Sequence, residues 1–342
     1  MPPTIHDVAR LAEVSIKTVS NVLNDYPHIR PATKQRVLDA IATLDYTPNL
    51  TARGLRSGRT GLVSLIIPDL RNAYFAELAD IVVRAAEAQG LSVLIAQSNG
   101  DRERELSLLS GPRMQMVDGI LFSALGLSAA DNDLLARIRT PMVLLGERIL
   151  DGPKDHVTMR NVEGTQAATE HLLSIGRRRL LAFGADPEQG TGSARLRLDG
   201  YRWALAGAGI AEDPDLVVRV VGWYRSTGAQ SMRRLLERGV EFDGVVAFND
   251  LIALGAMRVL QDAGLRIPED VAVIGFDDVD ETRYTLPTLS TIDPGREEIV
   301  EVALRWLTER IDGSAADLPP RDHLTAFRVL QRESTTPGGD GS

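Results

Sequence analysis

The stretch TIHDVARLAEVSIKTVSNVLN, which runs from Thr4 to Asn24, decides how the rest of the chain is interpreted. Its first half places apolar residues at i, i+3, i+4 and i+7, which predicts a short helix capped by Thr4. Its second half repeats such a stripe at Val19, Val22 and Leu23, behind Ser15 as the next cap. Two short helices joined by Glu13-Val14-Ser15 form a helix-turn-helix.

Packing of the second stripe onto the first helix leaves four side chains on the outer face: Ile16, Lys17, Ser20 and Asn21. A lysine can donate to guanine, an asparagine can pair with adenine, and an isoleucine can touch a thymine methyl group. The hydroxyl groups of Thr4, Ser15 and Thr18 suit phosphate oxygens. An ordinary helical hairpin with a solvated outer face fits the same pattern, so these residues alone leave both interpretations open.

The following segments add a third helix and a motif. Arg30-Pro31-Ala32-Thr33 opens the helix, and Val37, Ile41 and Leu44 close a small core. TVSNVLN at Thr18 to Asn24, YTPN at Tyr46 to Asn49 and ARGL at Ala52 to Leu55 then resemble the lactose-repressor (LacI/GalR) family of bacterial transcription regulators. The resemblance extends over essentially the whole chain. It implies these DNA-contacting residues: Thr4, Ser15, Ile16, Lys17, Thr18, Ser20, Asn21, Asn24, Ala52, Arg53, Leu55 and Arg56.

The resemblance also implies a hinge helix within 49–59. A helix of about two turns is too short to be stable alone in water, so we expect it to order only against DNA and a second copy of itself. In this family Leu55 would wedge into the minor groove, Ala52 would allow close approach, and Arg53 and Arg56 would meet phosphates. Gly54 makes the free hinge looser still.

Length and composition limit the class of protein. A chain of 342 residues is too long for one core. It contains no cysteine, which excludes disulfides and thiolate chemistry and suits the cytoplasm. Neither an export signal nor a membrane span is indicated. Residues 1–60 carry eight Lys or Arg against five acids, a balance of +3, so the rest carries −9 − 3 = −12. A basic head on an acidic body confines DNA binding to the head.

From Gly61 onward, short apolar runs alternate with helical patterns, which predicts an α/β fold with parallel sheets. Two sets of such units imply two doubly wound lobes, with the ligand beyond the strand carboxyl ends. This receptor resembles periplasmic sugar-binding proteins. We expect the chain to return to the first lobe near Thr291, with the helix Glu297 to Arg310, and to leave it near Pro319, placing a strand around Leu324 to Leu330 in the second.

The predicted domains follow from this. They are a headpiece at 1–48, the hinge at 49–59, a first lobe at 60–161 and 291–318, a second lobe at 162–290 and 319–334, and a disordered tail at 335–342.

Catalytic and metal-binding patterns are missing from the sequence. The five histidines are scattered, and neither His-Glu-x-x-His nor G-x-S-x-G occurs. Asp277, Asp278 and Asp280 suggest a cation site, but a ligand-hydroxyl acceptor with solvated neighbours fits their place after a strand better. We therefore expect no enzyme activity, no cofactor and no metal.

The resemblance assigns seven residues to the effector pocket: Asn72, Tyr74, Phe75, Arg197, Trp223, Asn249 and Asp277. Aromatic faces beside forked polar groups suit a hydroxylated small molecule. Four of these residues also have an ordinary structural interpretation. Tyr74 and Phe75 fit core aromatics, Asn249 fits a helix cap, and Arg197 fits a surface cation.

One departure concerns Arg160-Asn161, where the family usually has Asp-Asn. If Arg160 faces the cleft, it adds a second cation beside Arg197 and favours an acidic or phosphorylated effector. If it points outward, the effector remains a neutral sugar.

The sequence as a whole predicts a cytoplasmic, homodimeric transcriptional regulator that acts as a repressor on a near-palindromic operator, under allosteric control by a carbohydrate-like effector. An enzyme with an appended DNA-binding head and an exported solute-binding protein are the rival classes. The sequence supplies neither the catalytic groups of the first nor the export signal of the second.

Overall fold

The structure is a computed structural model that describes residues 3–23, 26–46, 59–186 and 192–336. The chain divides into two compact units, residues 1–60 and 61–342. The predicted hinge helix lies almost entirely outside the described residues. So do five predicted DNA-contacting residues: Asn24, Ala52, Arg53, Leu55 and Arg56.

The first unit is the predicted three-helix headpiece, with α1 (Ile5–Leu11), α2 (Ile16–Leu23) and α3 (Pro31–Leu44). Val8, Val19 and Val37, one from each helix, are completely buried at its centre. Thr4 is the N-cap of α1, and Pro31 begins α3, where a missing backbone N–H has no cost. The apolar stripes therefore form the expected small core.

The first lobe of the second unit contains a six-stranded parallel sheet in the order β11-β5-β4-β3-β1-β2. Its strands are β1 (Leu62–Ile67), β2 (Ser92–Gln97), β3 (Gly119–Ser123), β4 (Met142–Leu145), β5 (Asp155–Thr158) and β11 (Asp322–Leu324). Its helices are α5 (Ala73–Glu87), α6 (Arg102–Ser110), α7 (Asn132–Arg137) and α12 (Arg296–Asp312), with short 3-10 turns at Pro112–Met116 and Ala129–Asp131. The buried, almost wholly apolar strands β1, β3 and β4 lie in the middle, as a sheet covered on both faces requires.

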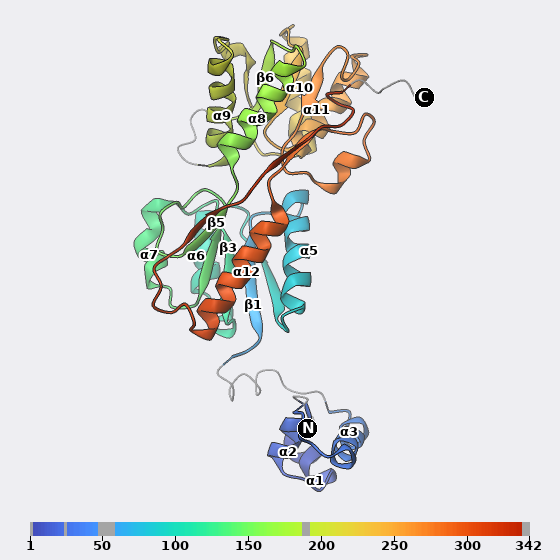
Figure 1. The fold of residues 1–342 in the computed structure, drawn as a ribbon, viewed down its shortest axis with the longest axis vertical. Coiled ribbons are helices and arrows are strands. Elements are labelled where there is room, and N and C mark those ends of the chain that lie inside the picture. The colour runs from blue at the N-terminus through green and yellow to red at the C-terminus, as the bar shows by residue number, and fades with distance from the viewer. Residues whose placement is uncertain (1–2, 24–25, 47–58, 187–191, 337–342) are drawn as a thin grey trace. The chain divides into compact units, whose positions relative to one another are not determined.

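The second lobe contains a four-stranded parallel sheet in the order β7-β6-β8-β9. Its strands are β6 (Leu180–Ala185), β7 (Val217–Arg219), β8 (Gly244–Ala247) and β9 (Ala272–Ile274). Figure 1 shows α8 (Asn161–Ser174) and α9 (Ser193–Gly207) on one side of β6, and α10 (Arg225–Glu237) and α11 (Asp250–Asp262) on the other. Short 3-10 turns occupy Pro214–Leu216 and Asp280–Arg283.

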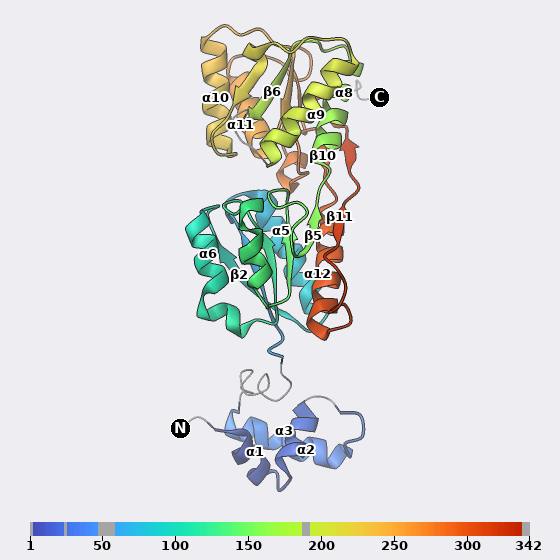
Figure 2. The ribbon, with the colours of Figure 1, turned by 90° about the vertical axis from the view of Figure 1, so that its left-hand side faces the viewer.

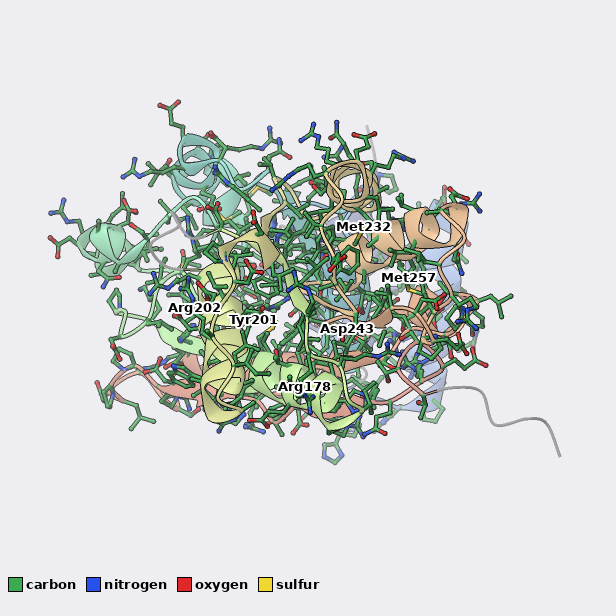
Figure 3. All side chains as sticks on the ribbon, turned by 90° about the horizontal axis from the view of Figure 1, so that it is seen from above. Arg178, Tyr201, Arg202, Met232, Asp243 and Met257 are labelled. Atoms are coloured by element: carbon green, nitrogen blue, oxygen red, sulfur yellow. The ribbon has the colours of Figure 1, made fainter. Side chains whose placement is uncertain are left out.

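Two glycines let the helices of each pair approach closely. A Cβ on Gly200 would lie 2.1 Å from the carbonyl oxygen of Val162, and one on Gly255 would lie 2.0 Å from that of Arg225. Next to the first of these contacts, Tyr201 of α9 is buried and donates to the carbonyl of Leu180 at 2.7 Å. Figure 3 shows Tyr201 with Arg202 on α9, and Met232 and Met257 on α10 and α11.

The chain crosses between the lobes where a two-stranded antiparallel sheet pairs β10 (Thr291–Asp293) with β12 (Arg328–Leu330). The predicted return near Thr291 is confirmed, because α12 packs against α5, β3, β4 and β5 of the first lobe. The predicted second-lobe strand around Leu324 to Leu330 is wrong. Instead β11 pairs with β5 in the first lobe (Figure 2), and only β12 lies at the crossing.

Asp155 is the physical reason for this difference. Its fully buried carboxylate pairs with Arg310 of α12 at 2.8 Å and with Arg321 at 2.9 Å, so the segment before β11 is tied to the first lobe. The predicted tail also begins too early. Thr335 is buried, and its hydroxyl group lies 2.8 Å from His171 Nε2 and 2.7 Å from Ser290 Oγ.

Among the described residues, none of the helices is long and apolar enough to cross a membrane.

Candidate functional sites

The hydroxyl groups of the headpiece serve as local caps. Thr4 donates from its hydroxyl group to Asp7 at 2.7 Å and from its backbone N–H at 2.9 Å. These hydrogen bonds lower the pKa of Asp7, and the one from the hydroxyl group has the larger effect. Ser15 and Thr18 share a 2.8 Å hydroxyl contact, and the Thr18 N–H donates to Ser15 Oγ at 3.1 Å. To donate to a phosphate, the Thr4 hydroxyl group and whichever of the Ser15 and Thr18 hydroxyl groups is the donor in their contact must give up these bonds.

The outer face of α2 is narrower than its sequence predicts. Lys17 is exposed and Ser20 and Asn21 are half-buried, whereas Ile16 packs in part against the headpiece core. Ile16 therefore does not point away from the core as predicted. Lys17, Ser20 and Asn21 remain as the polar surface of this helix.

A cavity of about 690 Å³ lies between the lobes of the second unit, where the strands of both sheets end at their carboxyl termini. Seven of the eight predicted effector residues line it: Asn72, Tyr74, Phe75, Arg197, Trp223, Asn249 and Asp277. These residues come from five separate loops or helix starts. The fold thus places around one cavity the residues that only the resemblance had assigned to a common pocket.

Arg197 is the centre of the second-lobe wall and is only 3% exposed. Its Nε donates to Asn161 Oδ1 at 2.7 Å, and its Nη1 donates to the carbonyl of Phe248. Its guanidinium lies 3.6 Å from the ring centre of Phe276 and 3.5 Å from the carboxylate of Asp277. The surface-cation interpretation of Arg197 is therefore wrong, because every part of this side chain is held inside the lobe.

Asp277 adds a buried carboxylate to the same wall. Its backbone has φ = 119°, a conformation that L residues rarely adopt, and this turn directs it beside Arg197. Burial raises the pKa of Asp277 to about 6, although Arg197 and Arg296 lower it. Behind it, Asp250 accepts from Thr291 Oγ1 at 2.6 Å and from the Val279 N–H at 3.0 Å. Burial holds the pKa of Asp250 well above its usual range.

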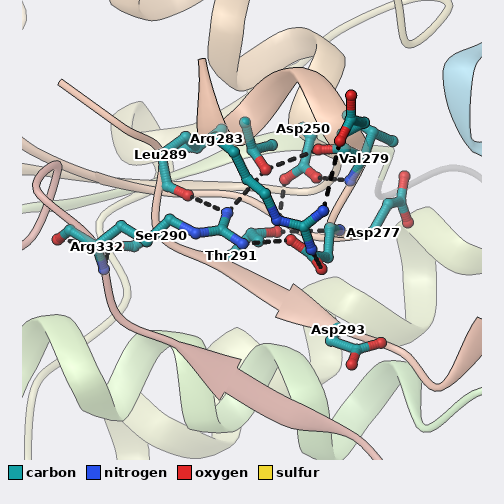
Figure 4. Close-up of polar contacts among 12 residues, drawn as sticks. Asp250, Asp277, Val279, Arg283, Leu289, Ser290, Thr291, Asp293 and Arg332 are labelled. Atoms are coloured by element: carbon teal, nitrogen blue, oxygen red, sulfur yellow. Dashed lines mark hydrogen bonds and ion pairs between the residues drawn. The ribbon is translucent and has the colours of Figure 1, made fainter. Parts of the chain in front are cut away.

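The neighbouring Asp278 is occupied by two arginines. It pairs with Arg283 and with Arg332, each at 2.6 Å, and Figure 4 shows both arginines converging beside Asp250 and Asp277. These guanidinium groups take the carboxylate oxygens that a cation would need. The arginines therefore hold the turn at Asp278 in place, and the neighbouring Asp277 lines the cavity, where it can accept from a ligand hydroxyl group.

Asn249 and Trp223 complete the second-lobe wall. The side chain of Asn249 accepts from the Ile252 N–H at 3.0 Å as the N-cap of α11, and it donates to the carbonyl of Trp223 at 3.4 Å. The indole of Trp223 donates to the carbonyl of Gly184 at 3.2 Å and meets Phe248 edge to face. Asn249 is thus both a helix cap and a pocket residue.

The first-lobe wall supplies aromatic surface. Asn72 caps α5 by accepting from the Tyr74 N–H at 3.1 Å. Tyr74 and Phe75 then pack edge to face with ring centres 5.2 Å apart, and Phe75 remains half-buried at the cavity. Burial raises the pKa of Tyr74, so its hydroxyl group stays protonated.

Sequence reasoning missed most of the other lining residues, among them Asp69, Arg71, Glu147 and Tyr224. Glu147 is 5% exposed and accepts from Ser193 Oγ and from Asn161 Nδ2, the latter at 3.4 Å. Asp69 and Glu147 each stand two residues after a buried strand, a position that could have identified them.

Direct contacts join the two lobes on both sides of the cavity. On one side, the Tyr224 hydroxyl of the second lobe donates to Asp69 of the first, which also pairs with Arg71 at 2.8 Å. On the other, the Asp280 N–H donates to Glu77 of α5 at 2.9 Å, and Glu77 pairs with Arg296 at 2.7 Å. Arg296 donates to the carbonyl of Asp278 at 3.0 Å.

Arg160 is the predicted effector residue that does not line the cavity. It is the N-cap residue of α8, and its side chain, 39% exposed, pairs with Glu163 at 3.0 Å. A carboxylate one turn along the helix therefore holds it away from the pocket. Of the two orientations that the sequence left open for Arg160, the structure has the outward one.

Comparison with known proteins defines the class. Residues 4–49 match "Bacterial regulatory proteins, lacI family" and residues 169–335 match "Periplasmic binding protein-like domain". The regulator CelR of Thermobifida fusca is 35% identical, over 97% of this chain and 98% of CelR. The ribose operon repressor of Escherichia coli K12 is 33% identical, over 90% and 93%.

Solved structures agree. A LacI-family regulator from Sanguibacter keddieii is 48% identical with a TM-score of 0.75, covering 82% of this chain and 100% of that one. A CelR–cellobiose complex is 32% identical with a TM-score of 0.69, covering 97% and 99%. A lac repressor dimer bound to operator and an anti-inducer is 25% identical with a TM-score of 0.84, covering 98% and 99%.

The protein is therefore a DNA-binding transcriptional regulator with a helix-turn-helix headpiece and a periplasmic-binding-protein-like effector domain. It belongs to the LacI family. The relatives reported above are regulators rather than enzymes.

Proposed function

We propose that this protein is a repressor that binds a near-palindromic operator as a homodimer and is controlled by a neutral sugar or sugar derivative. One observation carries the effector part of the proposal. Asp277, Asn249 and Glu147 offer hydroxyl acceptors in a single cavity whose walls also hold Phe75 and Trp223. Carbohydrates present hydroxyl groups at their edges and C–H surface on their faces, which is what such walls bind.

The charges in the cavity favour a neutral effector over an acidic one. The guanidinium of Arg197 is already held by Asn161, Phe248 and Asp277. Arg160, the cation that would have favoured an anion, pairs with Glu163 outside the cavity. Glu147 has no arginine or lysine partner among the described contacts. The lining as a whole holds four arginines (Arg71, Arg148, Arg197 and Arg219) and four acids (Asp69, Glu147, Asp186 and Asp277), so the cavity offers no net positive charge to an anion.

The relatives support a sugar. One is named for the ribose operon and another is solved with cellobiose. We infer a ligand of this class for the present cavity and leave the particular sugar open.

Binding to DNA as a dimer is supported by the headpiece and by the lac repressor, which is solved as a dimer on operator DNA. A two-fold dimer places two headpieces on two related half-sites. Lys17 and Asn21 are the base-reading candidates, and the predicted hinge, with Leu55 as the wedge, extends the contact to the minor groove. Because operator DNA is the proposed partner, the proposed place of action is the cytoplasm, at the nucleoid.

Calorimetric titration tests the effector. Full-length protein would be titrated with ribose, cellobiose, gluconate and glucose 6-phosphate, with Asp277→Asn as the site variant. We expect measurable binding of a neutral sugar, and a loss of at least about tenfold in Asp277→Asn, because asparagine keeps an acceptor oxygen but not the charge, and hydrogen bonds to charged groups contribute about 1.5–3 kcal/mol. Tight binding of only the acid or phosphate forms would overturn the neutral-sugar proposal.

Selection of operator sequences from a random DNA pool tests the DNA part. We expect a near-palindrome from the wild type and a relaxed preference at one position of each half-site from Lys17→Ala, with a loss of about 1–3 kcal/mol on the selected site. Lys34→Ala, which removes an exposed lysine of α3, is the matched control and should leave the base preference unchanged. Enrichment of no sequence at moderate ionic strength, with or without sugars, would contradict the proposal.

A further inference from the structure

Tyr224 joins the two lobes at the rim of the cavity. Tyr224 is the N-cap residue of α10 in the second lobe and lines the cavity immediately after Trp223. Its hydroxyl group donates to Asp69, which follows β1 in the first lobe. The residue is thus a direct bond between the two walls.

Asp69 is prepared to accept this bond. Its carboxylate is 7% exposed and also receives the Arg71 backbone N–H at 2.9 Å and Arg71 Nη2 at 2.8 Å. These donors fix both carboxylate oxygens in place. The guanidinium of Arg71 lies 5.3 Å from the centre of the Tyr224 ring and 3.4 Å from its hydroxyl oxygen.

The contact is charged over the usual range of pH. Hydrogen bonding from Arg71, followed by that from Tyr224, lowers the pKa of Asp69 to about 2, and the same contact raises the pKa of Tyr224. A protonated phenol therefore faces an ionised carboxylate at neutral pH. Hydrogen bonds of this charged kind contribute about twice as much as neutral ones.

We propose that Tyr224 is a positioning residue for the effector cavity, whose hydroxyl group latches the second lobe onto Asp69 and sets how far the empty cavity opens. Other bonds between the lobes lie at Glu77 and Arg296, and at Glu147, which accepts from Ser193 and Asn161 of the second lobe. Release of the latch would free the rim of the cavity at Asp69, while these bonds still join the walls elsewhere. The proposal calls the cavity an effector site and in that respect rests on the proposed function.

The test measures the distance between the lobes directly. Because the chain contains no cysteine, two spin labels can be placed on the full-length protein without background. We choose Ser107→Cys on α6 and Gln230→Cys on α10, both exposed, one in each lobe. Pulsed electron resonance then reports the distribution of distances in the absence of DNA and sugar.

The key variant is Tyr224→Phe, which keeps the ring and removes only the hydroxyl group. We expect the ratio of open to closed protein to rise by about tenfold or more, seen as a second, longer distance, because one hydrogen bond to a charged group is lost. The matched control is Tyr284→Phe, at a residue that is 79% exposed and has no described partner for its hydroxyl group. It should reproduce the wild-type distribution.

A second variant tests whether the hydroxyl group acts through Asp69. Asp69→Ala should open the lobes, and adding Tyr224→Phe to it should open them no further. Coinciding distributions for Tyr224→Phe and the wild type, in proteins of equal helix content, would overturn the latch. So would additive effects of the two substitutions. Neither result depends on DNA or effector binding, so failure of the latch is distinguishable from failure of the proposed function.

Discussion

The two walls of the cavity are stabilised in different ways. In the second lobe the gripping groups are buried, with Arg197, Asn249 and Asp277 at 3%, 1% and 6% exposure, and each is bonded within its own lobe. In the first lobe the principal ion pair is at the rim, where the side chain of Arg71 is 78% exposed. The second wall is therefore fixed before any ligand arrives, whereas the first wall depends on contacts that water can replace.

Because of this difference, arginine–aspartate pairs on the two walls have different roles. A guanidinium inside the second lobe holds the shape of the cavity, and one at the rim of the first lobe holds the lobes together. Substitutions of arginine and aspartate on the two walls should therefore differ in both size and sign.

The largest effect is expected at Arg197. Arg197→Met should lower the free energy of unfolding by about 3–5 kcal/mol, because it leaves Asp277 buried without its counter-charge. Arg71→Met, the matched substitution on the other wall, should cost less than about 1 kcal/mol, because the Arg71 side chain is 78% exposed and Asp69 keeps its hydrogen bonds from Tyr224 and from the residue 71 backbone N–H. Denaturant unfolding of the two variants measures the contrast. Equal losses would remove the distinction between the walls.

The dependence of stability on pH should have opposite signs on the two walls. Burial raises the pKa of Asp277 from its usual 3.8 to about 6, so the folded state holds a proton that the unfolded state has already released. Its contribution to stability is full below about pH 4 and is lost as pH rises through about 6. Wild type should therefore lose stability relative to Asp277→Asn across this window, by about 3 kcal/mol at most.

On the first wall, Arg71 lowers the pKa of Asp69 from 3.8 to about 2. The contribution of that carboxylate is present above about pH 4 and is lost as pH falls toward 2. Relative to Asp69→Asn, wild type should lose stability only on acidification. Unfolding curves at successive pH values test both variants, and slopes of the same sign would contradict the assignment of either carboxylate.

An element of the fold could be predicted from the sequence where the interactions that form it are between residues close together in the chain. The headpiece helices, β1 and β4 follow from apolar periodicity, which is a property of neighbouring residues. β5 contains no such apolar run, because its residues Asp155, His156 and Thr158 are polar. Their burial is explained by Arg310 and Arg321, more than 150 residues away in the chain. No pattern in the sequence near β5 predicts these distant ion-pair partners.

The site shows the same limit. The resemblance supplied Arg197, Trp223 and Asp277, which line the cavity. It supplied neither Tyr224 nor its bond to Asp69, because that bond joins two loops that the fold alone brings together. Ile16 was misplaced for a smaller reason, since it begins α2 beside the helix-turn-helix core and can turn partly inward.

The smallest effect is expected at Arg160, the residue for which the sequence left two interpretations open. Its pair with Glu163 is an exposed i, i+3 contact on the first turn of α8, and such pairs contribute about 0.2–0.5 kcal/mol. Arg160→Ala should therefore change stability within about 0.5 kcal/mol and should leave the affinity for a neutral sugar unchanged, as calorimetric titration would show. If instead Arg160→Ala abolished binding of a phosphorylated sugar that the wild type bound, the guanidinium would have to turn into the cavity when ligand arrives. In that case the second wall would recruit a charge from its exterior and would no longer be complete before binding.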